Sequence, residues 1–476
     1  MSHQDRDGHT ASAAHHQDLK HALDALWKPT VAAPIRFRND STWSPRSLVY
    51  AAMLWNWSDE KTLTKRFVLA RKVVIRMALV AQTPASSYQA FLKMLNTWTG
   101  ALARALTVVF RERMQADLAA RFLIAGFAVF GVDGSRLELP RTVSNETRFS
   151  PQAARRQTKA KPRHKPRRRA RTRADRARRA RQKKTNSPQM WLTTMFHVGT
   201  GLPWDWRTGP SDSSERGHMQ EMLDGLPKGA LVTADAGFVG YDAWEDLLNE
   251  GRHLLIRVGA NVRLLKNLGM VTRNKGLVYL WPDRAREQKQ RPLVLRLVVA
   301  VDGKQPVYLV TSVLDVTCLS DDQVREIYRR RWGIELFYRH FKQTFERRKL
   351  RSHCATNAEL EATWSLLSLW ALMLHAQVEQ ARLGIAAQRM SVAGVLQAYR
   401  TPLREYKSAP DPGESLRDLL SKAVIDPYQR GDKSSRDYPR KKQGHAIGAP
   451  RMLQATKAQI KAAREFRDQR TLRLTA

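Results

Sequence analysis

Four residues between positions 328 and 342 have types and spacing that suit phosphate chemistry. They are Tyr328, Arg331, Glu335 and Lys342, arranged as Tyr-x2-Arg-x3-Glu-x6-Lys. On a helix each residue turns by about 100°, so all four fall within an arc of about 60°. An acid flanked by a phenol, a guanidinium and an ammonium can hold a metal cation and a phosphate together. A solvated stripe with an Arg–Glu pair would show the same spacing.

Two aspartates next to predicted strands complete an acidic set. Asp133 closes the apolar run that begins at Phe127, and Asp235 follows the run Ala230–Thr233. Strand ends and a later helix can converge at one edge of a sheet, so Asp133, Asp235 and Glu335 form a predicted catalytic and metal-binding triad. Phosphodiester cleavage needs charge neutralised on both sides of the phosphorus, which two Mg²⁺ ions about 3.5–4 Å apart provide and Mn²⁺ can replace. Either aspartate alone would read as an ordinary turn carboxylate.

The elements that must position these residues follow an α/β order. Three strands in hairpin arrangement, followed by helix, strand, helix and strand, predict a mixed α/β sheet. The predicted strands cover residues 127–133, 191–198, 202–206, 230–233 and 253–258, and the predicted helices cover residues 213–226 and 241–249.

A second β-rich region, residues 262–315, separates this sheet from the helix that carries Glu335. Its strands are predicted at residues 276–281, 293–301 and 307–311, with Asp302-Gly303 as a hairpin turn between the last two. The pattern indicates a β-rich subdomain inserted before a long helix. That helix is predicted to begin near Asp321 and to run on to Lys349, because no proline interrupts it.

The flanking regions differ in composition from this catalytic part. Apolar residues at three- and four-residue spacing among basic ones predict an N-terminal helical domain with a basic face. We predict that this domain binds DNA, with a purely structural packing role as the alternative that the pattern leaves open. The predicted division is a disordered polar tail at 1–40, the helical domain at 41–121, the catalytic domain at 122–370, a helical C-terminal region at 371–435 and a basic tail at 436–476.

The charge of the chain favours a polyanionic partner. With 82 Lys and Arg against 44 Asp and Glu, the net charge is +38 and the isoelectric point about 10.8. The run from Arg155 to Lys184 carries 17 of the basic residues and one acid, and removing this net +16 still leaves +22 on the rest. We predict a basic insertion at residues 154–186 that acts as a non-specific DNA clamp, or else a disordered segment without that role.

Cysteine usage and hydropathy place the chain in a reducing compartment. Cys318 and Cys354 are the only two cysteines and lack metal-site spacing, which argues against a zinc centre and a disulfide scaffold. No apolar run has the length of a membrane span, and the polar N-terminus has no signal-peptide core. We therefore expect a cytoplasmic protein without a membrane partner.

Taken together, these motifs resemble those of the IS-four family of bacterial DDE transposases. The helix carries that family's Tyr-Arg-Glu-Lys signature without departure, and four residues at three fixed spacings make the match specific. The segments Gly131–Ser135 and Thr233–Phe238 also resemble the family. The resemblance covers residues 127–370, about half the chain. The basic run departs from it, because a compact connection is expected there.

The resemblance implies an RNase H-like catalytic core and a Mg²⁺-dependent DNA endonuclease and strand transferase. The triad would bind the metal ions, and the rest of the signature would contact DNA phosphates. Family members nick the element's end, form and open a hairpin, and join the freed 3′-hydroxyl to target DNA. An aromatic residue on the β-rich insertion would hold a flipped base, with Trp281 and Tyr308 as candidates. The implied DNA-contacting residues are Tyr328, Arg331 and Lys342.

The implied partners are double-stranded DNA, as terminal inverted repeats and as target, and a second copy of the chain. The implied location is the bacterial cytoplasm, in association with the nucleoid. Three alternatives stay open at this point: a transposase-derived DNA-binding protein that no longer cuts, an RNase H-like nuclease that does not join, and a basic RNA-binding protein. The presence of all three acids favours an active enzyme.

Overall fold

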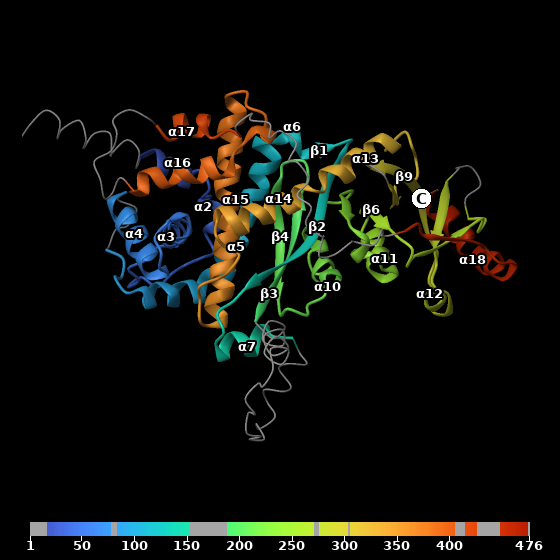
Figure 1. Cartoon of the computed structure of the whole chain (residues 1–476), viewed down its shortest axis with the longest axis horizontal. Helices are drawn as coiled ribbons and strands as arrows, with labels where there is room; N and C mark the ends of the chain where they lie inside the picture. The colour runs from blue at the N-terminus through green and yellow to red at the C-terminus, as the bar shows by residue number, and fades with distance from the viewer. Residues whose placement is uncertain are drawn as a thin grey trace, which may run out of the picture.

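The fold is known from a computed structural model that describes residues 17–77, 83–151, 188–270, 276–302, 305–404, 415–425 and 448–474. The predicted basic insertion therefore lies outside the described residues. The molecule is elongated (Figure 1): N-terminal and C-terminal helices form one end, a twisted sheet the middle, and the β-rich insertion with helix α18 the other end.

The N-terminal part of the structure is helical, and its first helix lies before residue 41. Leu19, Leu23 and Leu26 are at most 1% exposed, so residues 17–40 are not a disordered tail. Their leucines recur at three- and four-residue spacing, which buries one face of a short helix. The following helices are α2 (Pro29–Ala32), α3 (Pro45–Trp57), α4 (Leu63–Arg76), α5 (Tyr88–Asp117) and α6 (Ala119–Phe122).

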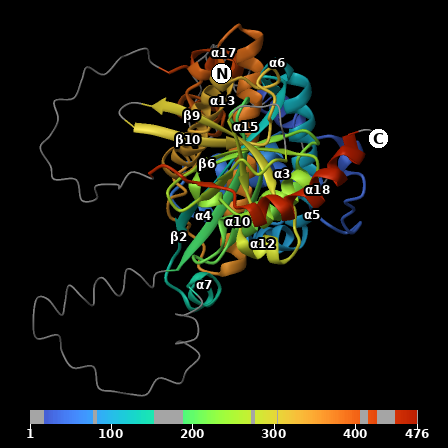
Figure 2. The same ribbon diagram turned by 90° about the vertical axis from the view of Figure 1, so that its right-hand side faces the viewer.

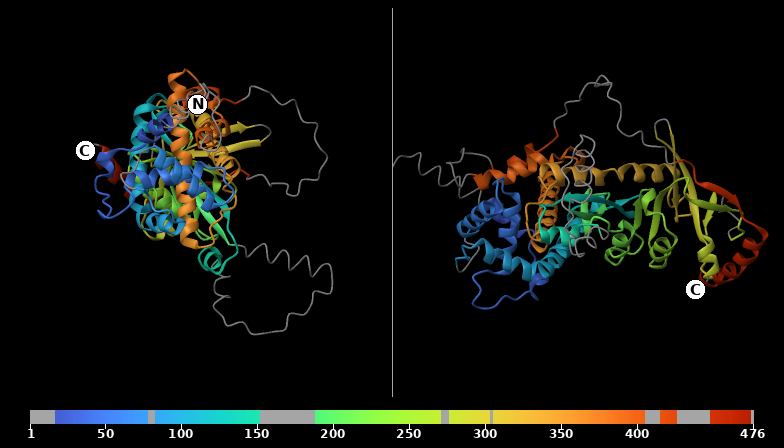
Figure 3. Two further views of the ribbon diagram at one scale, coloured as in Figure 1. Left: turned by 90° about the vertical axis from the view of Figure 1, so that its left-hand side faces the viewer. Right: turned by 60° about the horizontal axis from the view of Figure 1, so that its bottom comes forward.

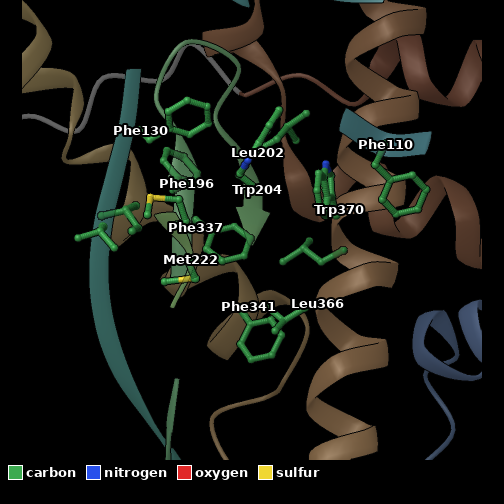
Figure 4. Close-up of a cluster of buried hydrophobic side chains, with 14 of the residues drawn as sticks. Phe110, Phe130, Phe196, Leu202, Trp204, Met222, Phe337, Phe341, Leu366 and Trp370 are labelled. Carbon is green, nitrogen blue, oxygen red and sulfur yellow. The ribbon is translucent and has the colours of Figure 1, made fainter. Parts of the chain in front are cut away.

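One long helix, α15 (Ala355–Arg382), ties these helices to the sheet. Its Trp364 donates from Nε1 to Thr99 Oγ1 of α5 at 2.8 Å, and Trp57 of α3 donates to its Ser368 carbonyl at 3.0 Å. Figure 4 shows Phe110 and Trp370 packed between α5 and α15, next to aromatic residues of the sheet. The helical end and the sheet therefore share one hydrophobic core.

The central sheet has the predicted mixed topology. Strand β2 (Phe127–Glu138) pairs antiparallel with β3 (Gln189–His197), which forms the predicted hairpin with β4 (Leu202–Gly209). On its other side β2 pairs parallel with β5 (Leu231–Ala234), and β5 pairs parallel with β6 (His253–Val258). The short strand β1 (Leu123–Ile124) folds back on β2.

The insertion is β-rich as predicted, but its strands belong to the same sheet. Strand β10 pairs antiparallel with β6, so the order β11-β7-β8-β9-β10-β6-β5-β2-β3-β4 runs without a break through an 11-stranded sheet, with β1 off this path. Figure 2 shows β9 and β10 projecting from the body of the molecule. The insertion consists of β7 (Arg263–Lys266), β8 (Leu277–Leu280), α12 (Asp283–Glu287), β9 (Leu293–Asp302) and β10 (Gln305–Thr311).

The predicted long helix is broken into three pieces. Helix α13 (Asp321–Arg330) starts at a capping box formed by Ser320 and Gln323, and a turn separates it from α14 (Gly333–Arg339). A π-helical turn, η3 (His340–Thr344), follows, and Glu346 then takes a positive φ of 55°. The expectation of one helix to Lys349 was therefore wrong. Figure 3 (right) shows these pieces bridging the helical end and the insertion.

The C-terminal segment from residue 448 adds a strand and a helix beside the insertion. Residues 451–454 form β11, which pairs parallel with β7, and α18 (Lys457–Leu474) packs beside it. Phe466 of α18 meets the Trp281 ring edge-on at 6.1 Å, which gives this basic segment an apolar anchor. The remaining helices are α7 (Val143–Phe149), α10 (Glu215–Gln220), η1 (Leu223–Gly225), η2 (Ala236–Phe238), α11 (Tyr241–Asn249), η4 (Ala387–Arg389), α16 (Val392–Arg404) and α17 (Leu416–Lys422).

Candidate active site

The two aspartates of the predicted triad stand at a gap in the sheet. Strand β5 pairs with β2 only as far as Gly131 and ends at Ala234, directly before Asp235. Strand β2 continues to Glu138 because β3 pairs with it along that whole length. The prediction that Asp133 closes its strand was therefore wrong. Asp133 lies within β2, on a stretch that pairs with β3 on one side and has no strand on its other side among the described residues.

The broken helix lies across the face of β2 that carries Asp133. A Cβ atom built on Gly131 would stand 3.6 Å from Cγ of Arg331, which is van der Waals contact, so Arg331 packs directly over this position. Two residues beyond Asp133, the Ser135 hydroxyl accepts a hydrogen bond from Lys342 Nζ at 2.5 Å. Alternate strand residues point to the same face, so positions 131, 133 and 135 all face the signature residues.

Tyr338 fixes the helix to the sheet, and sequence reasoning missed it. Its hydroxyl donates to the Asp133 carbonyl at 2.8 Å and lies 3.2 Å from the Leu192 carbonyl of β3. The side chain is 5% exposed, and burial raises the pKa of the phenol well above its usual range. The sequence did offer one signal for Tyr338: it follows Glu335 by three residues, which places both side chains on the same face of a helix.

Backbone amides next to the aspartates hold both carboxylates in place. The Gly134 N–H donates to Asp133 Oδ1 at 2.8 Å, and the Gly237 N–H donates to Asp235 Oδ1 at 2.8 Å. In the second case Asp235 caps the short helix η2. Each carboxylate thus has one oxygen oriented by the main chain.

Burial and the negative charges of neighbouring acids raise the pKa values of Asp133 and Glu335. Burial, and to a smaller extent the charges of Asp235 and Glu335, raise the pKa of Asp133 to about 6. Burial also raises the pKa of Glu335, and the charge of Asp235 adds to this. Arg331 opposes both shifts. The fold therefore gathers negative charge that one guanidinium only partly balances.

A fourth acid, Glu215 of α10, shares this environment and was not predicted. Burial, together with the charges of Asp133 and Asp235, raises the pKa of its carboxyl to about 7. Its sequence context, a capped short helix, carries no spacing that would mark it. Only the tertiary fold brings it to the two aspartates.

The donor set suits a hard divalent cation. Carboxylate oxygens are the ligands that Mg²⁺ and Mn²⁺ prefer, and a cation would stabilise the charged carboxylates against the burial and mutual repulsion that raise these pKa values. The residues therefore fit a metal by their chemistry and charge. By spacing, no three His, Cys, Asp or Glu side chains among the described residues already form a metal-binding group.

The remaining signature residues are partly buried beside the acids. The Arg331 guanidinium lies 5.2 Å from the ring centre of Tyr328, and burial raises the pKa of that phenol. Burial lowers the pKa of Lys342, with Arg348 nearby as a second cause. The structure thus gathers a phenol, a guanidinium and an ammonium around the acidic gap.

The two aromatic candidates on the insertion differ in accessibility. Trp281 is 4% exposed, donates from Nε1 to the Gln290 carbonyl at 2.8 Å and is covered by Phe466. Tyr308 on β10 is only half-buried. The described arrangement therefore leaves a ring surface available at Tyr308 and not at Trp281.

Comparison with known proteins assigns the chain to a family. A family described as "Transposase DDE domain" matches residues 130–371, half of the chain, and the chain belongs to that family. It is 27% identical over 210 residues to Transposase InsG for insertion sequence element IS4 of Escherichia coli (strain K12), a match that spans 41% of this chain and 45% of that relative. The chain thus matches less than half of that relative's length. The resemblance to the IS-four family is confirmed.

Among solved structures, the chain is similar to the piggyBac transposase synaptic complex with hairpin DNA, at 12% identity and a TM-score of 0.38 over 88% of this chain and 85% of that one. In the part of the chain that the structure describes, no helix is both long and apolar enough to cross a membrane.

Proposed function

We propose that the chain excises and inserts a bacterial insertion sequence by metal-dependent DNA strand cleavage and strand transfer. The observation that carries the proposal is the gap beside β2, where Asp133 and Asp235 meet the helix that bears Glu335. These three carboxylates would hold Mg²⁺ ions, or Mn²⁺ in their place. The membership in the transposase DDE domain family supports the same chemistry.

The metal ions would supply an activated oxygen nucleophile and stabilisation of the leaving oxygen. The chain's own residues orient the reacting phosphate. Arg331 and Lys342 would neutralise phosphate oxygens, and the Tyr328 ring keeps the Arg331 guanidinium in place. The Lys342 ammonium donates a hydrogen bond to Ser135, which holds this ammonium group two residues along β2 from Asp133 before the phosphate binds.

The proposed catalytic core is RNase H-like. Its support is the strand order β4-β3-β2-β5-β6, with antiparallel pairing up to β2 and parallel pairing beyond it. In this order β2 lies in the middle and β5 is its neighbour, although two strands, β3 and β4, separate them in the sequence. The aspartate on β2 therefore lies next to the aspartate that follows β5. The order therefore explains why residues 102 positions apart in the chain, Asp133 and Asp235, lie together.

The proposed substrate is double-stranded DNA, as the element's inverted repeats and as target, bound by two copies of the chain in the bacterial cytoplasm. The net charge of +38 supports a polyanionic partner. Tyr308 is the better candidate for holding a flipped base, because Trp281 lies under α18 in the described arrangement.

A separation of binding from cleavage tests the proposal. Glu335→Gln removes the negative charge but keeps the shape, so cleavage of end DNA should fall by at least about 100-fold while binding of the ends persists. The matched control is Glu326→Gln, because Glu326 pairs with Arg329 and Arg330 on the same helix run. Equal loss of binding and cleavage in Glu335→Gln would assign the residue a structural role and contradict the proposal.

A further inference from the structure

The Glu215 carboxylate enters the active site from the opposite side of the sheet. Helix α10 packs against the face of β2 that carries Gly134. Asp133 is on the opposite face, toward the signature helix, which is the name used for the run α13–α14–η3 that carries the Tyr-Arg-Glu-Lys residues. A Cβ atom on Gly134 would collide with Glu215 Oε1 and would stand 2.8 Å from the Trp191 ring. Glycine at 134 therefore opens the space that the Glu215 carboxylate occupies.

The same carboxylate reaches the second aspartate. A Cβ atom on Gly237 would stand 3.9 Å from Glu215 Oε2 and 3.0 Å from Asp235 Oδ1. Gly134 and Gly237 are also the residues whose amides hold Asp133 and Asp235. One carboxylate thus lies between the two glycines that orient the catalytic aspartates.

Helix α10 is fixed firmly enough to aim this side chain. His218 Nδ1 and Thr193 Oγ1 of β3 are 2.8 Å apart, and Arg216 donates to the Val239 carbonyl at 2.9 Å. Ser214 caps the helix directly before Glu215 by accepting from the Gly217 N–H. These bonds tie α10 to β3 and to the segment after η2, which are the elements next to Asp133 and Asp235.

A buried hydroxyl lies on the face of the sheet that carries Asp133 and Asp235. Thr233 on β5 is fully buried, is the register partner of Gly131 and stands two residues before Asp235 on the same strand face. Its Oγ1 has no hydrogen-bond partner among the described residues. Because buried hydroxyls are normally satisfied, this one is available to a polar ligand bound on the side of the sheet where Asp133 and Asp235 lie.

We infer that Glu215 is a fourth carboxylate of the active site, which helps Asp133 and Asp235 to hold the divalent cation. The inference rests on the proposed function. Its physical ground is the placement of a third acid between two aspartates on a fixed helix, without a basic partner at ion-pair distance in the described part of the chain. Such an arrangement is costly without a cation and is stabilised when one binds.

Direct measurement of Mn²⁺ binding tests the inference. The full chain is titrated with Mn²⁺, and free ion is followed by electron paramagnetic resonance. Glu215→Gln should weaken Mn²⁺ binding about 10-fold. The matched control, Glu221→Gln at the other end of α10, should bind like wild type, because its side chain is 61% exposed and faces Arg207. Cleavage of end DNA by Glu215→Gln should recover at correspondingly higher Mn²⁺.

The outcomes separate this inference from the proposed function. Wild-type Mn²⁺ affinity in Glu215→Gln, together with a loss in Asp133→Asn, overturns only the role of Glu215. Unchanged affinity in Asp133→Asn overturns the proposed function itself. Glu215→Asp provides a second variant with conserved charge, for which weaker Mn²⁺ binding at an unchanged metal-free unfolding temperature supports the inference. A lower unfolding temperature with wild-type Mn²⁺ affinity in both variants means a structural role and overturns it.

Discussion

Burial of the Asp133 carboxyl disfavours its charged form, so ionisation of this residue lowers the stability of the metal-free fold. Its pKa is raised to about 6 from an ordinary value near 4. The folded state therefore binds this proton more tightly than the unfolded state does. Below about pH 4 the carboxyl is protonated in both states and costs no stability. The cost of ionising it grows as the pH rises from about 4 to about 6 and is fully present above that.

Asp133→Asn should therefore stabilise the metal-free protein at pH 8. We expect the free energy of unfolding to rise by up to about 3 kcal/mol, from a shift of about two pKa units. The gain should shrink between pH 6 and pH 4. Urea denaturation at several pH values measures it, with Asp242→Asn on the exposed face of α11 as control. Destabilisation by Asp133→Asn at every pH would mean that the native fold favours the charged form.

The residues of the triad could be predicted because local signals mark them. Asp133 and Asp235 follow apolar runs, and Glu335 lies in a fixed spacing pattern. Glu215 could not be predicted, because its place depends on a contact with Gly134 across the sheet. The spacing of Tyr338 from Glu335 places it on the same helical face, but its bond to the Asp133 carbonyl is again a contact between distant segments. No short-range spacing encodes such contacts.

At the scale of elements, the end of the signature helix is held by one buried arginine. Arg347 is 2% exposed and donates to the Ser365 hydroxyl of α15 at 2.7 Å and to Asn56 Oδ1 of α3 at 3.2 Å. Burial lowers its pKa to about 10. The residue joins the segment behind Lys342 to the helical end of the molecule.

Arg347→Ala should destabilise the protein by about 3 kcal/mol, because it leaves buried partners unsatisfied. The neighbouring Arg348→Ala should change stability by less than about 0.5 kcal/mol, since the Arg348 side chain is 78% exposed. Chemical denaturation of the two variants side by side gives the comparison. Equal stability of the two variants would show that the buried network does not anchor this segment.

Element boundaries were harder to predict than the elements themselves. Periodicity located α11 and β6 correctly, but pairing with β3 extends β2 past Asp133 to Glu138. Between Asp321 and Lys349 the single glycine, Gly333, stands at the break after Arg331, and its low helix propensity was the available signal there. No residue type marks the π-helical turn. Both arise where the helix must follow β2 and then turn toward Glu138.

At the scale of the whole molecule, one sheet connects the catalytic gap with the insertion, and the C-terminal strand β11 closes its far end. The sequence indicated a separate β subdomain, because pairing between β10 and β6 is a long-range event that local patterns do not show. The net charge is likewise spread over the chain, with +22 outside the run Arg155–Lys184.

Deletion of residues 155–184 should weaken non-specific DNA binding and flatten its dependence on salt. Fewer phosphate contacts release fewer counterions, and each lost contact lowers the slope of log K against log salt by about 0.9. Filter binding with random-sequence duplexes between 50 and 200 mM salt, about the range over which such slopes are resolved, measures it. A slope equal to that of the intact chain would show that the run makes no DNA contacts.

The most direct measurement is cleavage of a supercoiled plasmid that carries the element's own ends, by wild type and by Asp133→Ala, with and without Mg²⁺. The account predicts breaks at the ends that need Mg²⁺ and disappear in the variant, while both proteins shift end DNA equally. Wild-type protein that is folded and binds the ends but leaves the plasmid intact in Mg²⁺ and in Mn²⁺ would contradict it, and the chain would then be a DNA-binding protein that does not cut.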